Sequence, residues 1–371
     1  MKLFAVAAPG LEGVVAAEVR ALAGVKLGSV VEVKGGVDFE GGRDALWAAN
    51  VHLRVASRVL VRVGVVEARD FAKLRAGAAK LGWRAYVAGG AAGAMPRVNV
   101  SVSAKKCRLY HTGAIAERVE GAIADALGGA APGAAGPEGP SLDVLVRGEH
   151  DVFTFSVDSS GELLHRRGWR VDTAPASLRE TLAAGLLALA GWTPDEPLVD
   201  PMCGAGTIVI EAALSALGRP PGGARRFACE QWPQAAPVAP GALSGAPAPE
   251  VPLVLGNERD LATLTLARRN AERAGVAAVV TLVHGDAARL LLPPTPRPGL
   301  ILANPPYGKR LADGASSSMA ALAALWKRAP GWRLAVLLPD DRAALRALSP
   351  RPPRERHPLD NGGLRVFLNV W

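Results

Sequence analysis

Residues 300–307 read LILANPPY, and this stretch restricts the possible folds more than any other part of the chain. Four consecutive apolar residues predict a strand that is buried on both faces, as in a parallel sheet covered by helices. Strand pairing must stop after Asn304, because Pro305 and Pro306 have no backbone N–H to donate. The amide, the prolines and the ring of Tyr307 are therefore expected at the carboxyl edge of a sheet, where open α/β folds bind their ligands.

The Asn-Pro-Pro-Tyr sequence suits the methylation of a planar amine. The lone pair of such an amine is delocalised, so the nitrogen is a poor nucleophile. The side-chain oxygen of Asn304 and the carbonyl of Pro305 could accept its two N–H bonds and leave the lone pair directed at an electrophilic methyl group. Pro306 would stiffen the loop, and Tyr307 would stack on a target base. A proline-rich turn with no chemical role is the alternative, so the rest of the chain has to decide.

A second predicted strand leads into a glycine turn. The apolar run Leu-Val ends in Asp200, and the chain continues through Cys203, Gly204 and Gly206 to Thr207 and an apolar helix. Strand, Gly-x-Gly turn and helix form half of a dinucleotide-binding fingerprint, with glycines where the backbone approaches a ligand. The third glycine is missing. Its absence favours a compact ligand such as S-adenosylmethionine, which has no pyrophosphate, over NAD or FAD.

Two further predicted strands are followed by acids. The run VPLVLG precedes Glu258, whose carboxylate could accept hydrogen bonds from both hydroxyls of a ribose, and Asp260 competes for the same role. The next strand precedes Asp286, which could accept from an adenine amino group. A Pro/Ala/Gly-rich insertion at 218–252 separates the glycine turn from the first of these acids. Glycine turn, acid, acid and NPPY thus follow successive strands in an ordered set.

The segment from Asp200 to Thr207, together with NPPYG, resembles the class I S-adenosylmethionine-dependent methyltransferases, specifically the bacterial THUMP-containing RNA guanine-N2 methyltransferases. The resemblance covers nearly the whole chain. The stretches AAPGLEGVVAAEVRAL, VKGGVDFEG and AKKCRLYHTGAIAERVEGAI are similar to the ferredoxin-like and THUMP regions of that family. The stretch LLHRRGWRVDTAPASLRETLAAGLLALAGW is similar to the entry into its catalytic domain, and the insertion after the glycine turn is a feature of the family too.

This resemblance implies a fold and a division of the chain. We expect an α+β N-terminal part, with a ferredoxin-like region at 1–56 and a THUMP domain at 57–158. An α/β class I methyltransferase domain should follow at 159–371, Rossmann-like and built on a seven-stranded sheet. Asn361-Gly362 between two strand-like segments predicts the antiparallel hairpin that ends such a sheet.

The resemblance also implies an activity, the transfer of a methyl group to the exocyclic N2 of a guanine in structured RNA. The RNA would be 23S ribosomal RNA in the first place and a tRNA in the second. Adenine-N6 methylation of a nucleic acid, glutamine methylation of a protein and non-catalytic RNA binding are the alternatives. Asn304, Pro305, Pro306 and Tyr307 would be catalytic, and S-adenosylmethionine would be bound by Asp200, Cys203, Gly204, Gly206, Thr207, Glu258, Asp286 and Asn304.

Positive charge is concentrated in the first third of the chain. Residues 1–130 contain 18 basic and 11 acidic side chains, whereas residues 131–371 contain 25 and 23. RNA, a polyanion, should therefore meet the N-terminal part first. Trp169 lies in a second basic segment, where it could follow RNA or anchor a core. The candidate RNA contacts in the two clusters are Lys105, Lys106, Arg108 and Tyr110, and Arg166, Arg167 and Arg170.

The three cysteines, Cys107, Cys203 and Cys229, lie far apart in the sequence. We therefore expect neither a zinc site nor a disulfide framework, no metal in the reaction and a cytoplasmic location. The apolar start of the chain is interrupted at Pro9 and Gly10, too early for a signal peptide. No apolar window of about eighteen residues predicts a membrane span. No pattern predicts an oligomeric state.

Short helices and strands are expected to alternate in the N-terminal part. Apolar periodicity predicts helices at 11–23, 71–81 and 113–127, and an antiparallel pair of strands at 142–147 and 152–156. This alternation is typical of small α+β units in tandem.

Overall fold

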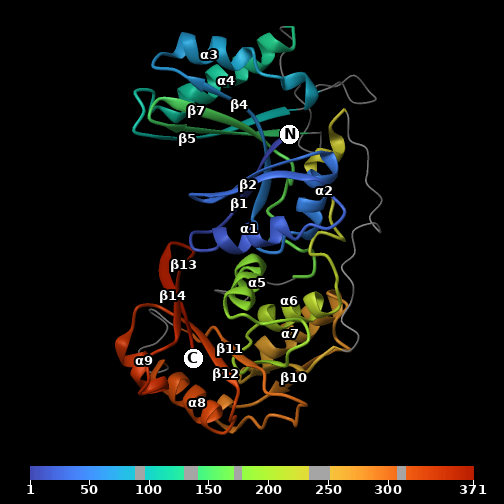
Figure 1. Cartoon of the computed structure of the whole chain (residues 1–371), viewed down its shortest axis with the longest axis vertical. Helices are drawn as coiled ribbons and strands as arrows, with labels where there is room; N and C mark the ends of the chain where they lie inside the picture. The colour runs from blue at the N-terminus through green and yellow to red at the C-terminus, as the bar shows by residue number, and fades with distance from the viewer. Residues whose placement is uncertain (88–96, 129–140, 171–177, 234–250, 307–314) are drawn as a thin grey trace.

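The computed structural model describes residues 1–87, 97–128, 141–170, 178–233, 251–306 and 315–371. The chain forms two lobes, each of which contains a seven-stranded sheet (Figure 1). We refer to residues 1–158 as the N-terminal lobe and to residues 159–371 as the C-terminal lobe.

The sheet of the N-terminal lobe is mixed. All neighbouring strands are antiparallel except β5 and β6. The antiparallel pair of β6 and β7 is the pair that the sequence predicted. The strand order is β2 (Leu27–Val33), β3 (Gly36–Gly41), β1 (Lys2–Val6), β4 (Arg58–Glu67), β7 (Val152–Asp158), β6 (Ser141–Glu149) and β5 (Arg97–Lys105).

The helices of this lobe bury the faces that their sequences predict. In the longest of them, α4, the apolar residues at helical spacing (Ile115, Val119 and Ile123) are all buried against the sheet. The helices predicted at 11–23, 71–81 and 113–127 agree with α1, α3 and α4 apart from their ends. The helices are α1 (Glu12–Arg20), α2 (Arg43–His52), α3 (Phe71–Ala79) and α4 (Thr112–Ala126), with the short helix η1 (Trp83–Ala85).

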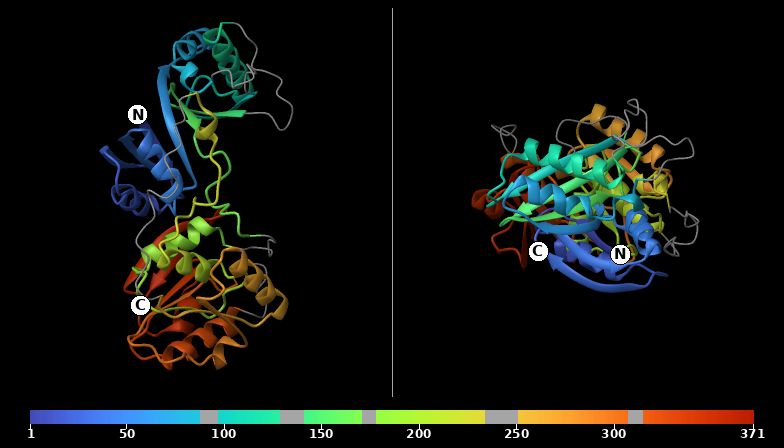
Figure 2. Two further views of the ribbon diagram at one scale, coloured as in Figure 1. Left: turned by 90° about the vertical axis from the view of Figure 1, so that its right-hand side faces the viewer. Right: turned by 90° about the horizontal axis from the view of Figure 1, so that it is seen from above.

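Strand β4 connects the two halves of the N-terminal sheet. It pairs with β1 as far as Val61, and from Leu60 onward it pairs with β7. Figure 2 shows β4 as a long strand that runs between the two halves. The predicted boundary between 1–56 and 57–158 thus falls just before a strand that both units share. The buried side chains nevertheless divide into two separate cores, one for each half.

The sheet of the C-terminal lobe has five parallel strands and ends in an antiparallel hairpin. Strands β10, β9, β8, β11 and β12 are parallel, whereas β14 is antiparallel to both β12 and β13. The predicted seven-stranded Rossmann-like sheet and its terminal hairpin are confirmed. The strand order is β10 (Val280–His284), β9 (Val254–Glu258), β8 (Leu198–Asp200), β11 (Leu300–Ala303), β12 (Arg333–Leu338), β14 (Leu364–Val370) and β13 (Glu355–Asn361).

Helices cover both faces of this sheet, and β11 shows why its sequence is wholly apolar. Leu300 and Leu302 point into a core that contains α5 and α6, whereas Ile301 and Ala303 point into a core that contains α8. All four side chains are 0% exposed, as the run LILA predicted. The helices are α5 (Glu180–Leu189), α6 (Thr207–Ala216), α7 (Leu261–Arg273), α8 (Ala315–Lys327) and α9 (Arg342–Leu348), with the short helices η2 (Ala228–Gln231) and η4 (Ala287–Arg289).

The two lobes share one hydrophobic core at their junction. Leu11, at the start of α1, packs against α5 so closely that a Cβ on Gly185 would lie 2.8 Å from the Leu11 side chain. Gly10 (φ 89°) approaches the backbone of Pro358 on β13 in the same way. The N-terminal lobe therefore contacts both α5 and the terminal hairpin, and its orientation relative to the C-terminal sheet is fixed by packing.

Candidate functional site

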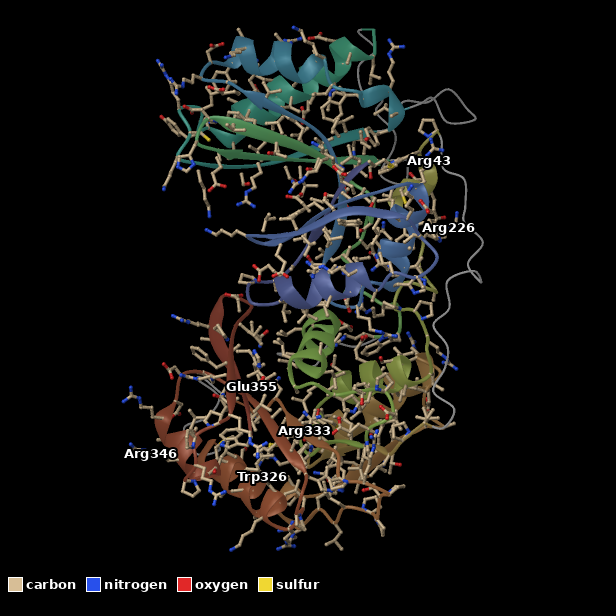
Figure 3. The ribbon with its side chains drawn as sticks, in the orientation of Figure 1. Arg43, Arg226, Trp326, Arg333, Arg346 and Glu355 are labelled. Atoms are coloured by element: carbon tan, nitrogen blue, oxygen red, sulfur yellow. The ribbon has the colours of Figure 1, made fainter. Side chains whose placement is uncertain are left out.

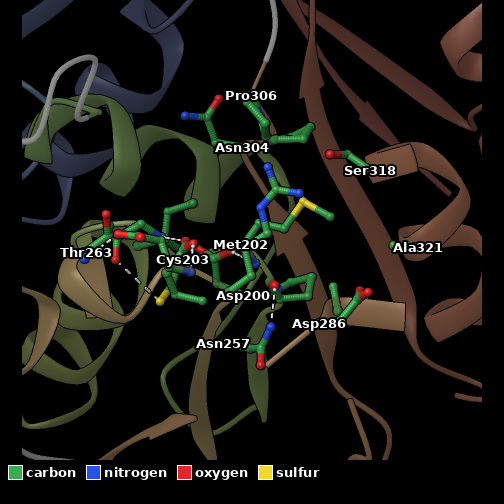
Figure 4. Close-up of a pocket in the computed structure, with 18 of the residues that line it drawn as sticks. Asp200, Met202, Cys203, Asn257, Thr263, Asp286, Asn304, Pro306, Ser318 and Ala321 are labelled. Atoms are coloured by element: carbon green, nitrogen blue, oxygen red, sulfur yellow. Dashed lines mark hydrogen bonds between the residues drawn. The ribbon is translucent and has the colours of Figure 1, made fainter. Parts of the chain in front are cut away.

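A cavity of about 1300 Å³ lies at the carboxyl ends of the parallel strands (Figure 4). Strands β8, β9, β10 and β11 all end at this edge, because parallel strands share one direction. Ligand sites usually have volumes of about 300–1000 Å³. This cavity is larger, which leaves room for a nucleoside-sized ligand together with a second planar group. The sequence-predicted residues in its wall are Asp200, Cys203, Gly204, Thr207, Glu258, Asp286, Asn304, Pro305 and Pro306.

The glycine turn after β8 takes a backbone conformation that favours glycine at both positions. Gly204 has φ 55° and Gly206 has φ 84°, both in the left-handed region. A Cβ on Gly206 would also lie 3.2 Å from Ala267, so this glycine lets α6 approach α7. A Cβ on Gly204 would meet nothing within 4 Å, and this backbone faces open space in the cavity wall. The turn therefore presents bare backbone to a ligand at Gly204, while Gly206 starts α6.

Asp200 is a buried acid in the cavity wall. It is 1% exposed, and its Oδ1 accepts a hydrogen bond from the Met202 amide at 3.1 Å. Burial raises the pKa of Asp200 to about 8; the Met202 hydrogen bond opposes this rise, and the charge of Glu258 adds to it. A cation bound beside Asp200 would lower this pKa again, because it stabilises the ionised carboxylate.

Glu258 and Asp260 both line the cavity, but they are engaged differently. The two carboxylate oxygens of Glu258 accept from the amides of Gly204 at 3.0 Å and Asp260 at 3.0 Å, so this side chain lies against the glycine turn. Asp260 caps α7 and accepts from the Thr263 amide at 2.7 Å. This hydrogen bond lowers the pKa of Asp260. Of these two acids, Glu258 is therefore the one that is bonded to the glycine turn.

Asn257 holds three strand ends together, a role that the sequence did not reveal. It is 2% exposed, and its Nδ2 donates to the carbonyls of Pro201 and Gly285, each at 3.0 Å. These carbonyls follow β8 and β10, on either side of β9. Asp286 comes next in the chain, and its Oδ1 accepts from the Ala288 amide at 2.8 Å at the start of η4. An asparagine at a buried strand end was the available signal.

Asn304 carries a buried acceptor without a partner. Its Oδ1 has no hydrogen bond among the described residues, although it is shielded from solvent. Asn304 and Pro306 lie together at one end of the cavity, at the tip of β11 (Figure 4). An unsatisfied buried acceptor costs about 1–3 kcal/mol, so a ligand N–H in this position would be favoured. Tyr307, the last residue of the motif, lies outside the described residues.

Helix α8 supplies an opposing wall that the sequence analysis missed. Its small side chains Ser318 and Ala321 face the cavity, as Figure 4 shows. The run SSSMAALAA gave a signal in retrospect, since small residues on a helix leave room beside it. Within the described part of the chain, no three His, Cys, Asp or Glu side chains come together to hold a metal ion.

The first predicted RNA cluster lies on the surface of the N-terminal lobe. Lys105 ends β5, and Lys106, Arg108 and Tyr110 follow it. All four are exposed, with Tyr110 at 78%. The helix after them, α4, is capped by the His111 ring, whose Nδ1 accepts from the Ala114 amide at 3.2 Å. Among the described residues, no helix has the length and apolar character needed to cross a bilayer.

The second predicted cluster is largely buried, which corrects the sequence interpretation. Arg167 is 5% exposed and forms an ion pair with Glu211 of α6, so the prediction that it contacts RNA is wrong. Arg170 is directed inward as well, and its side chain donates to Glu180 at 2.8 Å and to Thr207 at 2.9 Å. Both arginines are thus paired with carboxylates of helices, Arg167 with Glu211 of α6 and Arg170 with Glu180 of α5.

The other members of this cluster divide in the same way. Trp169 is 5% exposed and belongs to the core, which decides between its two proposed roles. Arg166 keeps an exposed side chain (64%) and pairs with Glu162, four residues earlier in the sequence.

Known proteins match this chain along most of its length. The RMKL-like methyltransferase domain matches residues 167–364, and the RlmL ferredoxin-like domain matches residues 2–60. The chain is 34% identical to the "Putative RNA methyltransferase YpsC" of Bacillus subtilis, over 84% of this chain and 80% of that protein. It is 32% identical to the "Ribosomal RNA large subunit methyltransferase K/L" of Photobacterium profundum over 83% of this chain, which spans only 44% of that relative.

Solved structures agree with these matches. The structure of SMU.472, described as "a putative methyltransferase complexed with SAH", has a TM-score of 0.88 at 28% identity and covers 100% of this chain and 97% of that one. A Listeria monocytogenes protein described as a "predicted N6-adenine-specific DNA methylase" also has a TM-score of 0.88, at 30% identity, and covers 100% and 95%. A domain match over more than half of the chain, a common fold and a cavity at the expected sheet edge lead to one conclusion: the chain belongs to the RMKL-like methyltransferase family.

Proposed function

We propose that the chain is a cytoplasmic S-adenosylmethionine-dependent RNA methyltransferase that modifies the exocyclic N2 of a guanine. Its substrate would be a structured RNA, 23S ribosomal RNA first and a tRNA second. The observation that carries this proposal is the buried, unpartnered Oδ1 of Asn304 in a cavity that also contains the buried acid Asp200. The printed names of the relatives, which include ribosomal RNA and RNA methyltransferases, support RNA as the substrate.

The residues of the cavity fit this cofactor. S-adenosylmethionine supplies an electrophilic methyl group on a cationic sulfur when it is bound. Asp200 lies in the cavity wall, where its carboxylate would ionise beside a bound cation, and the open backbone at Gly204 admits close approach. Glu258 would hold the ribose, because its carboxylate lies against the glycine turn, whereas Asp260 is engaged as a helix cap. Asp286 would accept from the adenine amino group.

Asn304 and Pro305 would orient the target amine. The Oδ1 of Asn304 lacks a donor among the described residues, and the amine of guanine brings two N–H groups. Accepting one N–H at Oδ1 and the other at the Pro305 carbonyl fixes the plane of the amine and aims its lone pair. The proton can leave to water after transfer, so this arrangement needs neither a strong general base nor a covalent bond to the chain. Pro306 stiffens the loop, and Tyr307 is assigned to stack on the base.

The N-terminal lobe would bind the RNA. Lys105, Lys106 and Arg108 are exposed and close in sequence, and Tyr110 adds an exposed ring for stacking. Since packing fixes this lobe relative to the C-terminal sheet, RNA held there has a defined position relative to the cavity.

Adenine-N6 methylation is the second candidate, because it needs the same planar amine and because one similar structure carries that description. Labelled S-adenosylmethionine, incubated separately with a 23S ribosomal RNA transcript, total tRNA and duplex DNA, followed by nucleoside analysis, separates the two. We expect N2-methylguanosine in an RNA. Methyladenine in DNA, with no label in either RNA, would replace this proposal by the second candidate.

The variant N304A tests the role of Asn304. We expect turnover to fall roughly 100-fold or more, because the amine loses an acceptor that fixes its orientation. Calorimetric titration should show S-adenosylmethionine binding within about twofold of the wild type, since Asp200, Glu258 and the glycine turn are intact. The matched control is N99A, which changes an asparagine of β5 that pairs with Asp143. Unchanged turnover in N304A would remove the proposed orienting step.

A further inference from the structure

Three arginines of the C-terminal lobe converge on one carboxylate. Arg342 is the first residue of α9, Arg356 lies on β13 and Arg365 lies on β14, and all three are exposed. Arg356 donates a hydrogen bond to Asp340. This bond, together with the charges of Arg356, Arg342 and Arg365, lowers the pKa of Asp340. We call Arg342, Arg356 and Arg365 the rim arginines.

An aromatic ring holds two of these cations together. The guanidinium carbon of Arg356 lies 3.8 Å from the centroid of Phe367, and that of Arg365 lies 5.4 Å from the same centroid. The opposite face of the hairpin carries Leu359 and Val366, which are buried in the core that joins the two lobes. The hairpin is therefore anchored on one face and presents cations on the other.

Two of the three rim arginines form no ion pair with a carboxylate in the described part of the chain. Asp340 pairs with Arg356, and Asp360 lies opposite Arg365 in the hairpin without an ion pair to it. Across the described ranges, no carboxylate lies within ion-pair distance of Arg342 or Arg365. A phosphate group suits these two cations, because its oxygens accept from guanidinium N–H groups in pairs.

These arginines lie beside the candidate active site. Asp340 follows β12, the parallel neighbour of β11, so it lies at the same sheet edge as Asn304. The tip of the hairpin reaches the cavity, since Asn361 forms part of its wall. The next two residues, Gly362 and Gly363, have φ 65° and 87°, and a Cβ on either would meet nothing within 4 Å. Figure 1 shows that this hairpin extends toward α1 of the N-terminal lobe.

We propose that the rim arginines bind backbone phosphates of the RNA next to the nucleotide whose base enters the cavity. This inference rests on the proposed function, because it assumes that an RNA base is the substrate. A base inside the cavity leaves its flanking phosphates at the mouth, where Arg342 and Arg365 have unmatched charge. Arg356 is bonded to Asp340 and lies over the Phe367 ring, on which Arg365 also lies. Contacts of this kind set the register of the target nucleotide without reading its sequence.

The sequence concealed this surface. Residues 340–365 contain six arginines but also four acids, and the charge of residues 131–371 is nearly balanced. The fold brings Arg342, Arg356 and Arg365 together from α9 and the two strands of the hairpin; Figure 3 labels Arg346 of α9 and Glu355 of β13 in this part of the lobe. The N-terminal lobe would hold the RNA at a distance from the cavity, and the rim arginines would hold it at the mouth.

The test compares two double variants that remove the same charge. R342Q/R365Q removes the two unmatched rim cations, and R268Q/R273Q removes two exposed arginines of α7. Filter binding to a 23S ribosomal RNA transcript is measured between 50 and 400 mM KCl. Each lost phosphate contact should reduce the slope of log affinity against log salt by about 0.9, so R342Q/R365Q should lose about 1.8. The α7 variant should keep the wild-type slope.

Kinetics add a second readout. For R342Q/R365Q we expect a higher KM for RNA, an unchanged kcat at saturating RNA and an unchanged Kd for S-adenosylmethionine. The single variant R365Q leaves the Arg356–Asp340 bond intact, and its slope should fall by about 0.9 even if the double variant does not fold. A wild-type slope in R365Q or in the folded double variant overturns the assignment of the rim. A reduced slope in an enzyme that methylates no RNA would leave the phosphate contact standing and remove the proposed function.

Discussion

Two groups of arginines in the C-terminal lobe have opposite environments. Arg166, Arg167 and Arg170 are neighbours in sequence, yet Arg167 is 5% exposed and Arg170 is directed toward Glu180 and Thr207. The rim arginines are spread over residues 342–365 and remain exposed around one carboxylate. In both cases the sequence shows only that several arginines lie in one segment, which does not reveal whether they are buried. What differs is that Arg167 and Arg170 are ion-paired inside the protein, whereas Arg342 and Arg365 are exposed and form no ion pair among the described residues.

Arg167 and Arg170 form what we call the buried group, whereas Arg166 stays exposed; Arg167 lies where the two lobes meet. Arg167 pairs with Glu211 of α6 at 3.3 Å, and Arg54 of the N-terminal lobe approaches the other oxygen of Glu211 at 3.8 Å. Glu18 of α1 accepts from the amides of Arg54 and Val55 at 3.2 and 3.1 Å. Helix α6 begins at the cavity, so charges at the lobe junction are connected to the glycine turn through one helix. The buried group is structural, whereas the exposed group is available to a ligand.

The largest effect is expected for R167A. Removal of Arg167 leaves the carboxylate of Glu211 buried with weaker compensation, and breaking a buried ion pair in this way costs about 3–5 kcal/mol. The neighbouring variant R166A removes an exposed pair and should change the free energy of unfolding by less than about 0.5 kcal/mol. Urea unfolding followed by circular dichroism measures both.

R342A is the matching variant in the exposed group, and its stability should equal that of R166A within about 0.5 kcal/mol. The comparison breaks if R167A unfolds at the wild-type urea concentration and binds RNA more weakly. Arg167 would then act as the sequence interpretation proposed, as a contact for RNA.

The sequence predicted those parts of the fold that depend on local patterns. LILA specified β11 because both faces of this strand are buried. The Asn-Gly signal specified the terminal hairpin, although its two turn residues are Gly362 and Gly363, which have positive φ, while Asn361 ends β13. The acids and glycines of the cavity were also predictable, because parallel strands bring their ends to one edge.

Features that arise from tertiary contacts were not predictable. The burial of Arg167 depends on Glu211, which comes from a helix about forty residues away, and no periodicity reports such a pairing. The role of Asn257 was hidden in the sequence for the same reason, because its two carbonyl partners belong to other strand ends. The convergence of Arg342 and Arg365 likewise requires the hairpin to fold beside α9.

The carboxylates beside the two groups of arginines should also differ in their effect on the pH dependence of stability. Burial raises the pKa of Glu18 from 4.5 to about 7, although Val55 and Arg54 oppose the rise, whereas the rim arginines lower the pKa of Asp340. The folded protein thus binds the Glu18 proton more tightly than the unfolded chain does. The associated stability is complete below about pH 4 and is lost as the pH rises through about 7, an effect on the order of 3 kcal/mol.

E18Q should therefore flatten the decline in the free energy of unfolding between pH 5 and 8. Asp200, whose pKa is raised to about 8, contributes a decline in the same direction and remains in this variant. D340N is the control from the exposed group, and it should leave this range of pH unchanged, because Asp340 titrates below it. Urea titrations at half-unit pH intervals measure both curves. If the free energy of unfolding of E18Q declines with pH as steeply as that of the wild type, Glu18 is ionised throughout this range and its surroundings are solvated.

The smallest expected effect is on ligand affinity, where the buried group should affect the cofactor and the rim arginines should affect RNA. Arg170 donates to Thr207 at 2.9 Å and to the Leu178 carbonyl at 2.9 Å, and both residues line the cavity. R170Q should weaken S-adenosylmethionine binding about tenfold, roughly 1.4 kcal/mol, because the charged hydrogen bonds to these two wall residues are lost. Its RNA affinity should stay within about twofold of the wild type. R365Q should show the reverse, with weaker RNA binding and an unchanged affinity for the cofactor. Calorimetry with S-adenosylmethionine and filter binding with the RNA transcript give both numbers for each variant. Should R170Q lose RNA affinity while its cofactor affinity is preserved, Arg170 belongs with the exposed arginines, and inward hydrogen bonds do not distinguish a structural arginine from one that binds RNA.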